Sequence, residues 1–174
     1  PIGPRTGETK TAEYTALNPR QKIPLLQDGD FTIGESAAIV AYLSQTYSTP
    51  GRSLIPAEPR RYASWLEWCF FIVAELDSTS LYVMRRHDAL NHIYGGARNV
   101  AASAVEYFRQ QLRHVDKALS DVRQFLMHDQ FTRADILLTT CLNWAIDYGV
   151  DICESAEPYR QRMLARPAFK SCSV

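Results

Sequence analysis

The feature that most constrains the fold is the helical spacing of apolar residues in the last two thirds of the sequence. Between residues 105 and 126, apolar side chains recur alternately every three and four positions, the period of a helix that buries one face. These positions are Val105, Phe108, Leu112, Val115, Leu119, Val122 and Phe125 or Leu126. An earlier stripe behind Pro59 consists of Tyr62, Trp65, Cys69, Ile72, Val73 and Leu76. We therefore expect long amphipathic helices in this part of the chain.

A third helix is predicted to begin at Thr132. The Thr132 hydroxyl can cap the helix while Asp135 reaches back from the third helical position, which together form a capping box. Residues 136–148 are nearly all apolar, as is typical of the buried central helix of an all-helical domain. Gly149 supplies a C-terminal stop, and residues 157–165 predict a last short helix.

The first fifty residues carry strand and turn signals instead. Residues 23–27 and 31–33 are short apolar segments on either side of Asp28-Gly29, a dipeptide that readily takes the positive φ of a tight hairpin turn. They predict two antiparallel strands. Pro24 has no N–H to donate to a sheet, so it belongs at a strand start or edge, where the bond before it can be cis.

Two helices flank this hairpin. Residues 11–17 predict one or two helical turns, which Asn18-Pro19 ends. Ser36 is a good N-cap for a second helix, whose apolar positions recur at helical spacing until it ends near Tyr47.

A turn-forming cluster at residues 48–53 separates the strand-bearing front from the helical back. We therefore predict a first domain over residues 1–48, a linker over residues 49–58 and an all-helical domain over residues 59–174.

The composition excludes several classes of partner. Lysine plus arginine number 19, as do aspartate plus glutamate, and no block of like charge interrupts the sequence. This balance argues against a nucleic acid or an anionic membrane as partner. No stretch approaches the about 20 apolar residues of a membrane helix, and the start lacks the pattern of a signal peptide. We expect a cytoplasmic protein with a small molecule or a protein as its partner.

The search for catalytic or metal-binding motifs is negative. The four cysteines are widely scattered without CxxC spacing, which favours reduced structural thiols over a metal site. The four histidines are isolated and favour solvated surface positions. We assign no metal ligand and no catalytic residue.

One constellation suits a peptide-like anion. The backbone of Ile23, before Pro24, can bond to an extended peptide as an added strand does. The helix that starts at Ser36 offers N–H groups, the positive end of its dipole and a hydroxyl to a carboxylate. Glu35 suits an ammonium group, and Lys22 suits a second, distal carboxylate. The alternative is that Ser36 is only a helix cap and that Lys22 and Glu35 are ordinary surface charges.

At these residues the sequence resembles the cytosolic glutathione transferase family of bacterial type. Residues 18–26 (NPRQKIPLL) resemble the family's segment before its third strand, which ends in a cis-proline. Residues 34–43 (GESAAIVAYL) resemble its acidic-residue-plus-serine motif, and residues 131–136 (FTRADI) its helical-domain capping box. The likeness extends from about Thr11 to Phe169.

The resemblance implies a fold and a set of binding residues. The fold is a thioredoxin-like N-terminal domain of α/β type, incomplete in this sequence, followed by an all-helical domain. Ile23, next to the expected cis-Pro24, is implied to bond the cysteinyl backbone of glutathione through its main chain. Glu35 and Ser36 are implied to hold the γ-glutamyl end, and Lys22 to reach the glycyl carboxylate.

The resemblance also implies that the family's first strand, first helix and most of its second strand precede Pro1. The residue that activates the glutathione thiol, a tyrosine, serine or cysteine, normally lies in that piece, so its identity is unknown here. The hairpin alone has little strand pairing, and we therefore expect the natural protein to contain the first strand.

The implied function is that of a homodimeric transferase. It conjugates or exchanges the thiolate of glutathione, its co-substrate, with an electrophilic small molecule. Tyr82, Arg85 and Arg86 are candidates for the wall of the second-substrate pocket. The alternatives are a non-catalytic dimerisation or partner-docking module of the same fold, and a specialised glutathione-dependent isomerase, dehalogenase or ether-cleaving enzyme.

Overall fold

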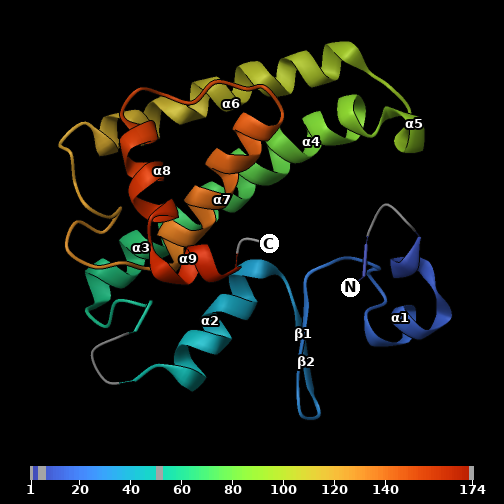
Figure 1. Ribbon diagram of the computed structural model, residues 1–174, viewed down its shortest axis with the longest axis horizontal. Coiled ribbons are helices and arrows are strands. Elements are labelled where there is room, and N and C mark those ends of the chain that lie inside the picture. The colour runs from blue at the N-terminus through green and yellow to red at the C-terminus, as the bar shows by residue number, and fades with distance from the viewer. Residues whose placement is uncertain (1, 4–6, 50–52, 173–174) are drawn as a thin grey trace. The chain divides into compact units, whose positions relative to one another are not determined.

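The computed structural model describes residues 2–3, 7–49 and 53–172 and is drawn in Figure 1. The chain divides into two compact units, Pro1–Ser53 and Leu54–Val174. The first unit contains a two-stranded sheet with short helices, and the second is built from helices and the loops between them.

The sheet of the first unit is a hairpin. Strand β1 (Leu25–Asp28) pairs antiparallel with β2 (Phe31–Gly34), in a register that sets Leu25 opposite Gly34. The predicted turn at Asp28-Gly29 is wrong by one residue, because Asp28 is still paired with Phe31 and Gly29 is the first residue of the turn. Gly29 takes a φ of 63°, which glycine adopts without the steric cost of a Cβ.

The helices of the first unit are the short η1 (Glu8–Lys10), α1 (Ala12–Leu17) and α2 (Ser36–Tyr47). The start of α2 corrects the prediction that Ser36 is the N-cap. Glu35 is the N-cap residue, since its carbonyl accepts the bond from the Ile39 amide at 2.9 Å. Glu35 has a φ of 69°, which no residue inside a right-handed helix adopts, so Ser36 becomes the first helical residue.

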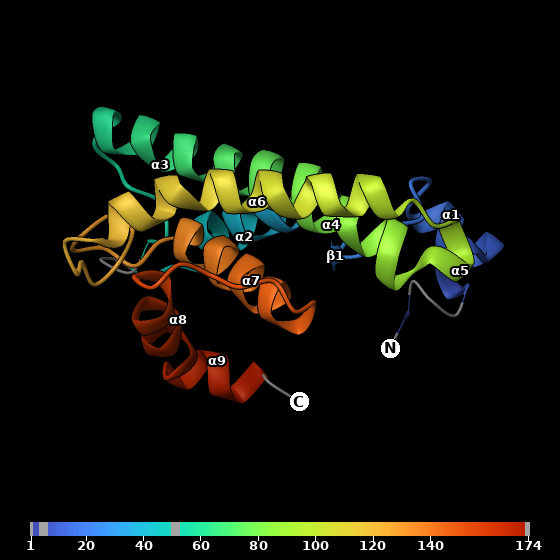
Figure 2. The same ribbon diagram turned by 90° about the horizontal axis from the view of Figure 1, so that it is seen from above.

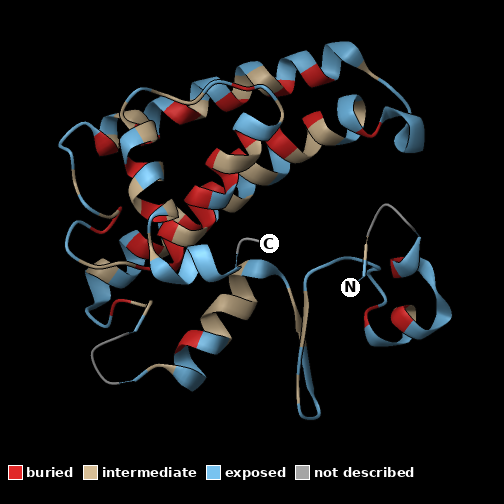
Figure 3. Ribbon diagram, viewed as in Figure 1, coloured by how far each residue is buried: buried red, intermediate tan, exposed pale blue. Residues whose placement is uncertain are grey.

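Few side chains of the first unit are buried (Figure 3). Tyr14 is its one buried apolar residue among those described, while Leu43 is 37% and Tyr47 61% exposed. Hydrogen bonds join the hairpin to α2 instead, because the hydroxyls of Tyr42 and Tyr47 both donate to the Asp28 carboxylate.

The second unit begins with one continuous helical stretch. It comprises α3 (Pro59–Phe71), η2 (Ile72–Leu81), α4 (Tyr82–Met84) and η3 (Arg85–Ala89). The η2 and η3 segments are π-helical, and bonds to the fifth preceding residue run from Tyr82 N to Asp77 O and from Leu90 N to Arg85 O. This wider winding was not predicted.

The predicted stripe of this helix is largely confirmed. Trp65, Cys69, Ile72 and Leu76 are buried, whereas Tyr62 is 42% exposed. Further along, the wider turns bring Ser80, Leu81 and Met84 to the buried side.

The remaining helices are α5 (Asn91–Tyr94), α6 (Arg98–Leu119), α7 (Arg133–Asp147), α8 (Ala156–Leu164) and α9 (Pro167–Cys172). Helix α6 runs antiparallel beside the α3–α4 stretch (Figure 2), and α7 packs against η2 and α8. The apolar residues of α7 that are most fully buried are Ala134, Leu138, Leu142 and Ala145. The prediction of a buried central helix is thus confirmed, whereas α9 was not predicted.

Helix α6 ends earlier than its apolar pattern predicts. Phe108, Leu112, Val115 and Leu119 are buried as expected. Val122, however, lies beyond the helix end with a φ of 59° and is 78% exposed. The apolar pattern therefore continued by coincidence into a loop.

The loop after α6 is tied to α7 and α8 by Asp135. The predicted capping box is confirmed, since the Asp135 Oδ2 atom accepts from the Thr132 amide at 2.8 Å. The Oδ1 atom accepts from the Leu126 amide at 2.8 Å and from the Tyr159 hydroxyl at 2.7 Å. Burial nevertheless raises the pKa of Asp135. The predicted stop is also confirmed, with Gly149 at a φ of 72°.

Among the described residues, no helix combines the length and apolarity that spanning a bilayer requires. The same residues contain no cluster of three or more histidine, cysteine, aspartate or glutamate side chains that could hold a metal ion.

Candidate functional site

The loop before β1 is braced at the carbonyl of Lys22. The hydroxyl of the buried Tyr14 donates to this oxygen at 2.7 Å, and the Asn18 Nδ2 atom donates to it at the same distance. Asn18 also accepts from the Arg20 amide at 3.1 Å. Two buried side chains thus fix the main chain that leads into Ile23.

The main chain of Ile23 is open for strand-like pairing. The Ile23–Pro24 peptide bond is cis, as the resemblance implied, and the Ile23 side chain is 44% exposed. Pairing of β1 starts only at Leu25, and the described residues provide no hydrogen-bond partner for the Ile23 backbone. Its N–H and C=O are therefore free to meet an extended ligand.

The helix mouth at Ser36 lies beside this open segment. Leu25 pairs with Gly34, and the Pro24 carbonyl oxygen lies 3.8 Å from where a Cβ on Gly34 would be, so the residue after Ile23 lies next to the residue two before Ser36. The Ser36 side chain is exposed, and no hydrogen bond of its hydroxyl to another described residue is found. As the first residue of a 12-residue helix, Ser36 also lies where backbone N–H groups lack partners within the helix.

Glu35 already has a charged partner. Its carboxylate forms an ion pair with Arg20, and the two side chains are 55% and 62% exposed respectively. An ion pair this exposed is weak, so a ligand can compete for either member. Arg20 was missed by the sequence reasoning, and the only available signal was a second basic residue close to Lys22.

The structure thus brings together the loop of Lys22 and Ile23 and the helix mouth of Glu35 and Ser36. The Lys22 side chain is exposed, and its carbonyl is fixed by the contacts described above. That these residues, with Pro24, hold glutathione stays a prediction.

The candidates in the second unit lie on consecutive helical turns. Tyr82 is half-buried on α4, while Arg85 and Arg86 begin η3. The Arg85 guanidinium lies over the ring of Trp144, at 5.6 Å from its centre, and that of Arg86 lies over Tyr94, at 4.8 Å.

The cysteines do not form an activated thiol site. All four are unpaired, with Cys69 and Cys141 buried. Burial raises the pKa of the thiols of Cys69, Cys141 and Cys153, which disfavours the nucleophilic thiolate.

Comparison with known proteins relates this arrangement to one family. Residues 1–45 match the family described as "Glutathione S-transferase, N-terminal domain". The "Glutathione S-transferase 3" of Zea mays is 31% identical over 181 residues, which cover 98% of this chain and 78% of the relative.

Solved structures show the same fold. A glutathione S-transferase domain-containing protein of Marinobacter aquaeolei VT8 matches with a TM-score of 0.84 and 24% identity, over 97% of this chain and 84% of its own. The theta class glutathione S-transferase of Xanthomonas axonopodis pv. citri, solved with glutathione bound, matches with a TM-score of 0.82 and 24% identity, over 99% and 83%. These similarities confirm the predicted fold class, a thioredoxin-like N-terminal domain followed by an all-helical domain.

Proposed function

The chain belongs to the glutathione S-transferase family, and from this premise we propose that its strand-bearing domain binds glutathione at Ile23 and Ser36. It is a glutathione transferase, an enzyme with glutathione as its co-substrate. We also propose the division of labour between a glutathione-binding domain (residues 1–48), a linker (residues 49–58) and a helical domain (residues 59–174) that receives the electrophile.

The observation that carries the binding proposal is the position of the Ile23 backbone beside the mouth of α2. The unpaired N–H and C=O of Ile23 suit the cysteinyl backbone of glutathione, which is extended like a strand. The Ser36 hydroxyl and the N-terminus of α2 suit the γ-glutamyl carboxylate. Glu35 then binds the ammonium group, beside Arg20 or in competition with it.

Two basic side chains of the loop serve the far end of the tripeptide. Lys22 is exposed, and Arg20 becomes available when Glu35 takes the ligand ammonium. Either cation is a suitable partner for the glycyl carboxylate.

The proposed reaction joins the sulfur of glutathione to an electrophilic centre of a small molecule. The thiol loses its proton, and the thiolate donates an electron pair to the electrophilic centre. The bond to a leaving group breaks as that group departs with its electron pair, or, in an addition, the π-bond of the electrophile breaks and its electron pair takes up a proton. We assign thiol activation to none of the described cysteines, because burial raises the pKa of three of them.

We further propose a cytoplasmic homodimer. The exposed aromatic side chains of α3 support an apolar interface, since Phe70 is 69% and Tyr62 42% exposed. The four unpaired cysteines support a reducing compartment. Analytical ultracentrifugation tests the dimer, and a monomer at micromolar concentration would reject it.

Calorimetric titration with glutathione tests the site. Ser36→Ala should weaken binding by about 1 to 3 kcal/mol, because the hydroxyl is expected to bond a charged carboxylate. Ser103→Ala is the matched control, since Ser103 is also an exposed helical serine but lies on α6. Unchanged affinity in Ser36→Ala would remove Ser36 from the site. A protein that does not bind glutathione at all would favour the docking module.

A further inference from the structure

Arg85 is a half-buried cation without a counter-ion. Its Nε atom is buried and lacks a hydrogen-bond partner, and no ion pair or hydrogen bond joins any part of its side chain to the described residues. The two Nη groups are not buried. Because the covered Nε has lost its water, the guanidinium is incompletely hydrated, which strengthens its attraction for an anion.

This situation is unusual within the chain. Several arginines have a carboxylate partner: the pairs are Arg20–Glu35, Arg61–Asp129, Arg109–Glu106, Arg123–Asp121 and Arg160–Glu157. The Nε atoms of Arg133 and Arg162 are also buried without a hydrogen bond to that atom. Arg162, however, donates through Nη2 to the Arg123 carbonyl at 2.8 Å, and the Arg133 side chain interacts with the Cys69 thiol. Buried unsatisfied donors in native proteins call for an explanation, and an absent ligand is one.

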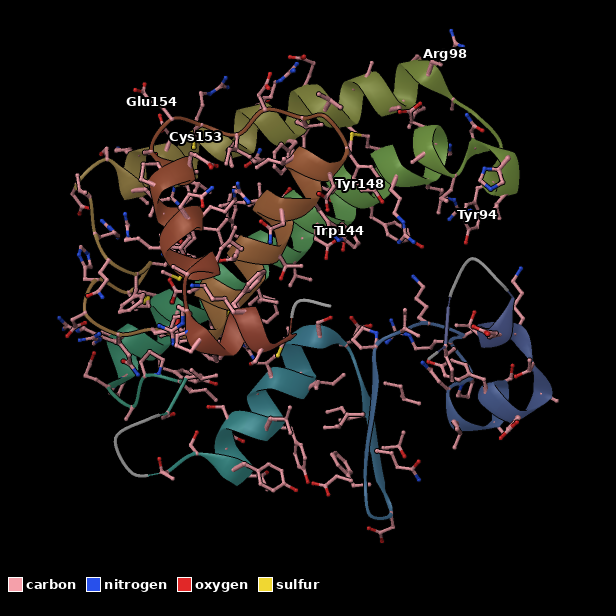
Figure 4. The ribbon with its side chains drawn as sticks, viewed as in Figure 1. Tyr94, Arg98, Trp144, Tyr148, Cys153 and Glu154 are labelled. Carbon is pink, nitrogen blue, oxygen red and sulfur yellow. The ribbon has the colours of Figure 1, made fainter. Side chains whose placement is uncertain are left out.

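The surroundings of Arg85 supply flat aromatic surfaces. Trp144, under the guanidinium, is half-buried, and its ring centre lies 6.3 Å from that of Tyr148. Figure 4 labels Trp144, on the last turn of α7, and Tyr148, which follows the end of that helix. Tyr148 also lines an open hollow of about 290 Å³ together with Met84, which precedes Arg85. Of these three side chains only Tyr148 lines the hollow, while the Trp144 ring neighbours both Tyr148 and the Arg85 guanidinium.

The local charge favours an anion. Within residues 84–98 the basic residues Arg85, Arg86 and Arg98 outnumber the one acid, Asp88. Asp88 and Arg98 both line the hollow, so their charges offset each other there. Arg86 lies over Tyr94 and has no carboxylate partner among the described residues. The excess positive charge of residues 84–98 is therefore at Arg85 and Arg86, while α7 contributes the exposed Asp147 next to Tyr148.

We propose that Arg85, Trp144 and Tyr148 form a binding site for a planar aromatic anion. The carboxylate or sulfonate of the ligand accepts from the Nη groups of Arg85, and its ring packs on the aromatic side chains of α7. This proposal names the chemical class of the second substrate. That substrate role rests on the proposed glutathione transferase function, whereas binding of the anion does not.

Calorimetric titration with 2-naphthoate and its neutral analogue 2-naphthamide tests the site. Wild-type protein should bind 2-naphthoate at least about tenfold more tightly, since a hydrogen bond to a charged group is worth that ratio or more. Arg85→Gln should abolish this preference while leaving the affinity for 2-naphthamide unchanged. Arg113→Gln is the matched control, because Arg113 is exposed on α6 and has no carboxylate partner among the described residues.

The aromatic part of the site has its own variants. Trp144→Leu should weaken both probes, and Trp144→Phe should restore much of the binding. Equal wild-type affinity for the two probes would overturn the proposal, as would an Arg85→Gln protein that retains the preference. If Arg85→Gln does not fold, the proposal is tested by the affinities of the two probes for the wild-type protein and for the Trp144 variants.

Glutathione is titrated into each of the same proteins. An Arg85→Gln protein that loses 2-naphthoate binding but keeps its glutathione affinity supports both proposals. Binding of 2-naphthoate without any glutathione binding would reject the proposed function and leave the anion site standing. Glutathione binding without a preference for 2-naphthoate would reject the anion site alone.

Discussion

The pair of Asp121 and Arg123 shows how single side chains fix the loop after α6. Arg123 donates to the Asp121 carboxylate through Nε at 2.9 Å and through Nη2 at 2.8 Å. Its Nη1 atom donates to the carbonyl of the buried Leu126 at 3.2 Å. The hydrogen bonds from the Arg123 side chain, together with that from its backbone amide, lower the pKa of Asp121 from its ordinary 3.8 to about 2.

We predict that Asp121 contributes to the acid sensitivity of the protein. A carboxyl group with a lowered folded-state pKa stabilises the fold above its unfolded pKa, and this contribution is lost as the pH falls through the folded value. Asp121→Asn should therefore flatten the decline in melting temperature between about pH 4 and pH 2, the range that the two values span. Asp147→Asn, at an exposed position, should keep the wild-type slope. Circular dichroism melts across this range measure both, and an unchanged slope for Asp121→Asn contradicts the prediction.

At the candidate glutathione site, the sequence predicted the local elements better than their exact geometry. Ser36 was correctly expected at a helix start, because serine chemistry favours that position. Its place as the first helical residue depends on the positive φ of Glu35, which follows from the path of the chain out of β2. The pairing of Arg20 with Glu35 joins residues far apart in sequence, so no local pattern predicts it.

At the scale of helices and strands, local signals predicted boundaries and failed where the winding changed. The short helix predicted over residues 11–17, the capping box at Thr132 and the stop at Gly149 all depend on signals within a few residues and are confirmed. A helical period of 3.6 residues cannot anticipate the π-helical η2 and η3. Such segments often occur at functional sites, and η3 begins with Arg85.

The stop of α7 provides a prediction about the helix end. Gly149 has a φ of 72°, and a Cβ added there would meet no atom within 4 Å. Gly149→Ala should therefore lower the free energy of unfolding by about 1 to 2 kcal/mol through backbone conformation alone. Gly96→Ala is the control, because Gly96 lacks a positive φ and the added Cβ would lie 3.5 Å from Asn91 Cβ, an ordinary contact. Urea unfolding followed by circular dichroism measures both, and equal effects of the two variants would refute the explanation.

For the whole molecule, the sequence predicted the fold class because its two parts have different periodicities and because three motifs resemble one family. It did not predict which helices touch, since those contacts join residues far apart in the chain. The antiparallel packing of α6 on the α3–α4 stretch and the link from Asp135 to Tyr159 are examples. The contact between Arg85 and Trp144 was likewise not predictable, because it depends on how η3 and α7 pack.

The two proposed ligands bind different units, and hydrogen exchange can separate them. A ligand that binds only the folded state stabilises it by about 2.7 kcal/mol when its free concentration is 100 times its dissociation constant. Amide exchange then slows in those segments whose local unfolding would release the ligand. At that excess, glutathione should slow exchange at Ile23 and in the first turn of α2 (Ser36–Tyr47). The anion 2-naphthoate should instead slow exchange in η3 (Arg85–Ala89) and around Tyr148.

Mass spectrometry of peptides from the two units measures these effects, and the variants supply the controls. Ser36→Ala should reduce the protection by glutathione, and Arg85→Gln the protection by 2-naphthoate, each without altering the other. Because Ile23 has no backbone partner among the described residues, its amide should exchange freely until glutathione binds. An Ile23 amide that is already protected in the free protein, or that is unaffected by glutathione, would contradict its role as the strand that receives the tripeptide.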